Sequence, residues 1–176
     1  MPASRTGFSF NTMNLRALFL FAHLLGVVLW LGLSFTLSFV TGKAARDPDP
    51  NVGAFAYRAA ARLLRTLGVA GVVLTLAGGI GLIAVTDYGF FRPFPHHWLF
   101  QMQLLGLVAA ALALFYQIPV AERLARAAEA RAGSDDGPDA TRAAAFAGLR
   151  KRNAIVGSLI GFLLIVLVGL GSFRVP

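Results

Sequence analysis

The chain has 176 residues, of which 57% are hydrophobic and only 14% are charged, whereas soluble domains average about 45–50% and about 25%. This balance argues against a soluble enzyme, and the absence of cysteine excludes disulfides, thiolate metal sites, iron–sulfur clusters and covalently attached c-type haem. The net charge of +8 would suit nucleic acid, but the basic residues flank apolar runs. We therefore expect lipid head groups, and no nucleic acid, as partners.

Four long runs contain no Asp, Glu, Lys or Arg. They hold 26, 21, 29 and 21 residues, and each reaches the roughly 20 residues that a helix needs to cross the bilayer core. The first run is too long for the core of a signal peptide and is expected to remain a span. The runs predict an all-α polytopic membrane protein, a single four-helix bundle. The expected spans are Ala17–Val40, Leu67–Thr86, Trp98–Val120 and Ala154–Leu170.

Lys and Arg are distributed unevenly between the two sides of this bundle. The connections 41–66 and 121–153 carry twelve of them. The opposite side carries four, Arg5, Arg16, Arg92 and Arg174. Because basic residues accumulate in cytoplasmic loops, we expect both termini and the connection 87–97 outside, and the two basic connections inside, against acidic head groups.

The two inner connections are expected to be partly helical. Residues 54–65 are rich in helix formers, and Arg58, Arg62 and Arg65 share one helical face, which predicts a basic amphipathic stretch lying at the inner head groups. In the other inner connection, 121–153, a helix is expected to begin near Ala140 and to run into the last span.

Small residues recur at the spacing that lets membrane helices approach closely. They suit either a compact bundle or the formation of a homo-oligomer, and the sequence leaves both uses open. The members are Ala22 and Gly26 in the first span, Gly78, Gly79 and Gly81 in the second, and Gly157 and Gly161 in the fourth.

His23 is an ionisable residue within a predicted span, which makes it a functional candidate because a polar group is costly in lipid. It lies about 9 Å inward from the outer boundary at the 1.5 Å rise per residue of a helix. Trp30 follows at i+7 on the same face. A neutral imidazole there can ligate haem iron or another metal, transfer protons, or hydrogen-bond a neighbouring helix. The sequence leaves these uses open.

Met102 lies near the outer end of the third span, at a depth comparable with that of His23. A His/Met pair is one known haem-iron ligation, whereas a methionine in a membrane span can equally be a core filler. The flanking Gln101 and Gln103 are expected to face the bundle and to form hydrogen bonds.

The outer connection adds Arg92, His96 and His97. These three residues suit haem propionates, a metal ion or acidic lipid. The alternative is a set of solvated residues beside an interfacial aromatic belt.

Several short motifs resemble those of a known family, in the same order along all four spans. Together they resemble the HemJ-type protoporphyrinogen oxidases and the related CopD-like copper-resistance membrane proteins. The motifs are Phe21-Ala22-His23 with Trp30-Leu31-Gly32, Arg62-Leu63-Leu64-Arg65, Leu74-Thr75 with Gly79, Trp98-Leu99, and Arg150-Lys151-Arg152-Asn153.

The resemblance implies a bacterial cytoplasmic membrane protein that binds b-type haem through His23 and has a redox or tetrapyrrole-related role. The family's third-span lysine, tied to haem and activity, is replaced here by Met102, a residue that can itself ligate iron. We expect Trp30 and Arg92 to complete the cofactor site. Whether the chain is an enzyme stays open.

Two further functions are compatible with the sequence. The first is CopD-like copper handling, with His23, Met102, His96 and His97 as ligands of suitable type. The second is a non-catalytic role as an accessory or assembly subunit of a larger respiratory or photosynthetic membrane complex, in which the glycine-rich faces serve for docking.

Overall fold

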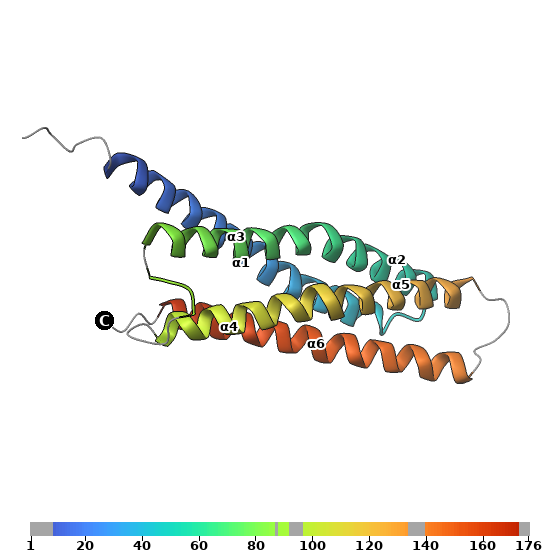
Figure 1. Cartoon of the computed structure of the whole chain (residues 1–176). Coiled ribbons are helices and arrows are strands. Elements are labelled where there is room, and N and C mark those ends of the chain that lie inside the picture. The colour runs from blue at the N-terminus through green and yellow to red at the C-terminus, as the bar shows by residue number, and fades with distance from the viewer. Residues whose placement is uncertain (1–8, 87, 92–96, 134–139, 173–176) are drawn as a thin grey trace, which may run out of the picture.

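The structure is a computed structural model that describes residues 9–86, 88–91, 97–133 and 140–172, with side chains from residue 14 onward (Figure 1). All regular structure in this part of the chain is helical. The elements are α1 (Ser9–Ala44), α2 (Pro50–Leu63), the π-helix η1 (Leu64–Gly68), α3 (Val69–Thr86), α4 (His97–Ala111), the π-helix η2 (Leu112–Gln117), α5 (Ile118–Ala132) and α6 (Ala140–Ser172).

The helices form four continuous rods, which confirms the predicted four-helix membrane bundle. Each rod is long and apolar enough to cross a membrane. The rods exceed the expected spans because much of the inner connections is helical and prolongs them. The described rods are Asn14–Ala44, Pro50–Thr86, His97–Ala132 and Ala140–Ser172.

The rods pack in pairs. α1 lies along α3 and α4 lies along α6, while α2 and α5 form a third pair at the opposite end of the bundle (Figure 1). The first turns of α1, drawn in dark blue, extend away from the rest of the bundle (Figure 1). The half of the molecule that contains α3 and α4 is therefore built from two helix pairs, and α1 also contacts α6.

The basic stretch in the first inner connection is helical, but it does not lie on the membrane surface as expected. It is helical, as predicted, and α2 starts where the Asp49 carboxylate accepts a hydrogen bond of 2.8 Å from the backbone N–H of Asn51. However, α2 continues through η1 into α3 and packs against α5. It is thus the inner extension of a membrane span and not a separate helix lying on the surface, because apolar contacts with α5 cover one of its faces.

Each of the two central rods contains a π-helical segment. In the rod 97–132, η2 ends two residues before Pro119, which lacks an N–H and whose ring crowds the carbonyl one turn earlier. A wider π turn relieves that conflict. Such segments are rare and are often found at functional sites. Both π segments contribute to the wall of the same cavity, described below.

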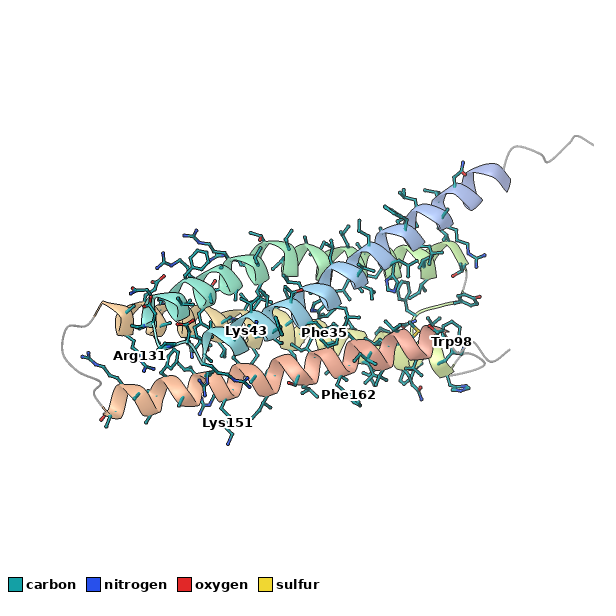
Figure 2. All side chains as sticks on the ribbon, turned by 180° about the vertical axis from the view of Figure 1, so that it is seen from behind. Phe35, Lys43, Trp98, Arg131, Lys151 and Phe162 are labelled. Carbon is teal, nitrogen blue, oxygen red and sulfur yellow. The ribbon has the colours of Figure 1, made fainter. Side chains whose placement is uncertain are left out.

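Two apolar clusters hold the bundle together. One joins α2 to α5 through small residues and Leu124, which is 1% exposed. The other surrounds Trp30 at mid-length and includes Val72 and Ile160. Figure 2 shows Lys43, Arg131 and Lys151 toward the α2–α5 end and Trp98 toward the other. This is the charge asymmetry on which the predicted orientation rests.

Candidate functional site

His23 is partly buried and faces α3. Its Nδ1 lies 2.7 Å from the backbone oxygen of Thr75, which is hydrogen-bonding distance. The ring lies over Gly79, where a Cβ atom would come within 3.3 Å of Nδ1. Of the uses left open by the sequence, a hydrogen bond to a neighbouring helix is therefore the one observed at this nitrogen.

Glycines bring α1 and α3 close enough for this contact. A Cβ atom on Gly78 would lie 2.5 Å from the backbone nitrogen of His23. One on Gly26 would lie 2.4 Å from the backbone nitrogen of Thr75. Only residues without side chains fit at these two positions, and the resulting backbone approach lets a short imidazole reach a carbonyl across the helix interface.

The hydrogen bond also defines the chemistry of the ring. A carbonyl oxygen can only accept, so Nδ1 of His23 carries the proton and donates it to Thr75. In the neutral imidazole, Nε2 then bears a lone pair. Metal-ligating histidines characteristically donate their other ring N–H to a carbonyl or carboxylate in this way, which fixes the tautomer and the ring orientation. The arrangement thus leaves one ligating nitrogen.

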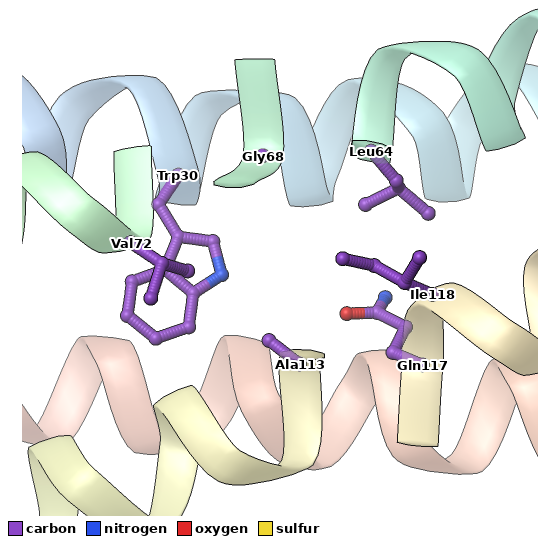
Figure 3. A pocket seen from close by; sticks show the side chains of 7 residues that line it. All are labelled: Trp30, Leu64, Gly68, Val72, Ala113, Gln117 and Ile118. Atoms are coloured by element: carbon purple, nitrogen blue, oxygen red, sulfur yellow. The ribbon is translucent and has the colours of Figure 1, made fainter. Parts of the chain in front are cut away.

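Trp30 is 2% exposed and belongs to the central apolar cluster. It borders a cavity of about 10 Å³, which is close to the space that one water molecule occupies. Figure 3 shows the indole nitrogen of Trp30 and the side-chain amide of Gln117 directed into this cavity. Both groups are buried and polar, so they make the cavity suitable for water.

Gln117 is a buried polar residue that was not among the predicted site residues. It is 6% exposed and lies at the end of η2, one residue before α5. Its position in a charge-free run was a usable signal, because a glutamine in lipid is expected to face the protein. The acceptor role of Thr75 had no such signal, because the atom involved is a backbone oxygen.

Met102 packs against α6. Its Cε would lie 3.4 Å from a Cβ atom built on Gly171. His23 rests on α3, so the two proposed iron or copper ligands contact different helices. The neighbouring Gln103 forms the expected hydrogen bond, in which its Oε1 accepts from the backbone N–H of Phe91 at 2.7 Å. Gln101 is exposed.

The outer connection is described only in part. Arg92 and His96, two of the predicted ligands, lie outside the described residues. His97 is exposed at the start of α4. Phe91 has a φ of 51°, in the left-handed region that a bulky residue rarely occupies, and its N–H is held by the Gln103 amide. Among the described residues, no three His, Cys, Asp or Glu side chains come together as a metal-binding group.

Comparisons of the chain with protein-family models, with curated protein sequences and with solved structures gave no match.

Proposed function

We propose that the chain is a small integral membrane protein of the bacterial cytoplasmic membrane that binds b-type haem through Nε2 of His23. The four-helix bundle supports the membrane location, and the resemblance in the four spans supports the haem. The observation that carries the proposal is the hydrogen bond from Nδ1 to the Thr75 oxygen. It provides the tautomer and the orientation that a ligating histidine needs.

The available space restricts where the group would lie. Pockets for small molecules and cofactors measure about 300–1,000 Å³. The cavity beside Trp30 measures about 10 Å³, so it does not take a haem. The group would instead lie on the exposed side of the α1–α3 pair, where His23 is only partly covered. In this arrangement Trp30 is a core residue behind the site and not a wall of it.

In this arrangement the haem and the protein would have different roles. Bound haem would supply one-electron redox chemistry. The chain would hold His23 in one tautomer through Thr75, and would keep the ring in place over Gly79. Leu20, an exposed apolar residue three positions before His23 on the same helical face, would help to exclude water from the iron.

The decisive experiment is an optical spectrum of detergent-purified protein from haem-supplemented cells. We expect a reduced-minus-oxidised spectrum typical of b-type haem in the wild type. We expect the same spectrum in a His97→Ala control, because His97 is exposed at the start of α4. The spectrum should disappear in His23→Ala. Added imidazole should restore it in His23→Gly, which would identify His23 as a ligand and not only as a structural residue.

Two outcomes contradict the proposal. A colourless wild-type preparation would refute haem binding. In that case a lower melting temperature of His23→Ala would assign His23 a structural role, as expected for a non-catalytic subunit of a larger complex. Retention of the full haem spectrum in His23→Ala would show that another residue ligates the iron. Size-exclusion profiles of each variant establish that it is folded.

A further inference from the structure

Two ion pairs link the second rod (50–86) to α5 and show how the two are aligned. Arg58 on α2 pairs with Glu129 on α5. Arg65 pairs with Glu122 at 3.1 Å. Arg65 lies in η1, which continues α2. Because this later arginine pairs with the earlier glutamate of α5, the two rods are antiparallel here. The seven-residue separation is the same on both helices, so the facing edges stay in register between the two bridges.

Arg62 and Arg126 lie between these bridges. Arg62 follows Arg58 by four residues, and Arg126 precedes Glu129 by three, so each shares the helical edge of its paired neighbours. At 1.5 Å per residue, their backbones lie about 6 Å and about 4.5 Å from the Arg58–Glu129 level, which places them nearly opposite each other. Both are exposed.

This placement puts two like charges at nearly the same level along the two helices. The carboxylates nearest to Arg126 along α5, Glu122 and Glu129, are already paired with other arginines. Within the described residues, no ion pair is formed by Arg62 or Arg126. The buried cluster of Leu64, Leu124 and small residues beneath holds the backbones of the two arginines at this level of the bundle. An anion between the two guanidinium groups would compensate the charge.

The depth of the two arginines indicates which anion. Arg62 lies four residues before the charge-free run that begins at residue 66, and Arg126 lies five residues after the run that ends at 121. These separations correspond to about 6 Å and about 7.5 Å beyond the apolar core. The head-group layer is about 5–7.5 Å thick on each side of a bilayer. Both side chains therefore lie at the level of lipid phosphates.

We propose that Arg62 and Arg126 together bind the phosphate group of an anionic lipid at the inner membrane surface. Guanidinium groups form paired hydrogen bonds to phosphate oxygens, which gives geometric preference in addition to charge. The flanking Arg–Glu bridges hold the two helices in register around the site. The site is remote from His23, and the proposal does not depend on haem binding.

The test is retention of lipid by the purified full-length chain in neutral detergent, measured by native mass spectrometry with added phosphatidylglycerol or phosphatidylcholine. Neutral detergent removes the charged surface that attracts any basic segment. Arg62→Gln/Arg126→Gln is compared with Lys151→Gln/Arg152→Gln, which removes the same charge from exposed positions on α6. We expect phosphatidylglycerol to be retained about ten-fold less by the first variant, and to nearly the wild-type extent by the second.

A further variant and a further ligand make the result specific. Arg62→Lys/Arg126→Lys keeps the charge but loses the planar guanidinium, so it should retain an intermediate amount of lipid. Equal retention by the two glutamine variants, each shown to be folded by its melting temperature, would overturn the proposal. If inorganic phosphate alone stabilises the wild type as much as phosphatidylglycerol does, and the first variant loses this effect, the ligand is soluble phosphate and the lipid assignment is wrong.

Discussion

Substitution of Gly78 by alanine tests whether His23 is held in place by the close approach of α1 and α3 at this glycine. The new Cβ would lie 2.5 Å from the His23 backbone nitrogen, 0.9 Å short of the 3.4 Å at which ordinary contact begins. It would also lie 2.8 Å from the carbonyl oxygen of Phe19. Both neighbours are backbone atoms, so no rotamer change relieves the overlap. The helices α1 and α3 must separate by about 1 Å, and overpacking of this kind costs about 1–3 kcal/mol.

Gly32→Ala is the matched control. A Cβ there meets nothing within 4 Å, so this variant gains helix propensity without a steric cost. Both variants share the propensity gain, and the difference in their free energies of unfolding isolates the steric term of about 1–3 kcal/mol. The measurement is equilibrium unfolding in mixed micelles, followed by circular dichroism. Equal stability of Gly78→Ala and Gly32→Ala would refute the close crossing.

Two further predictions concern the central cavity and the membrane orientation. In a Trp98→Phe background, where Trp30 is the single tryptophan, Gln117→Leu should shift the fluorescence emission to shorter wavelength, because the cavity loses its polar lining. It should leave stability within about 1 kcal/mol of the parent, since a buried amide is replaced by an apolar group of similar size. Because the chain has no cysteine, Phe90→Cys should be labelled by an impermeant maleimide in intact cells, and Ala130→Cys only after permeabilisation.

Each of these predictions has its own contradicting result. Gln101→Leu, on the exposed side of α4, serves as the control for the fluorescence experiment. An identical emission maximum for Gln117→Leu and Gln101→Leu would show that the amide does not face Trp30. Labelling of Ala130→Cys in intact cells, with Phe90→Cys protected, would reverse the orientation inferred from the basic residues.

The candidate site was predictable only in part. The cost of a polar group in lipid was sufficient to select His23 from the sequence. It did not reveal the partner, because the Thr75 acceptor is a backbone atom that every residue type possesses. The grouping of His23 with Met102 rested on similar depth. Depth does not define which helix a side chain faces, and Met102 packs toward Gly171 on α6.

Four apolar helices, with most of the basic residues toward one end of the bundle, follow from the sequence alone, because the length of a charge-free run and the position of each cation are properties of the chain. Which glycines carry the helix contacts depends on the packing of the folded bundle. Gly26 and Gly78 lie against backbone atoms of the opposite helix, whereas a Cβ on Gly161 would meet nothing within 4 Å. The physical reason is that small residues permit close approach at many places, and the packing of all four rods selects where it occurs.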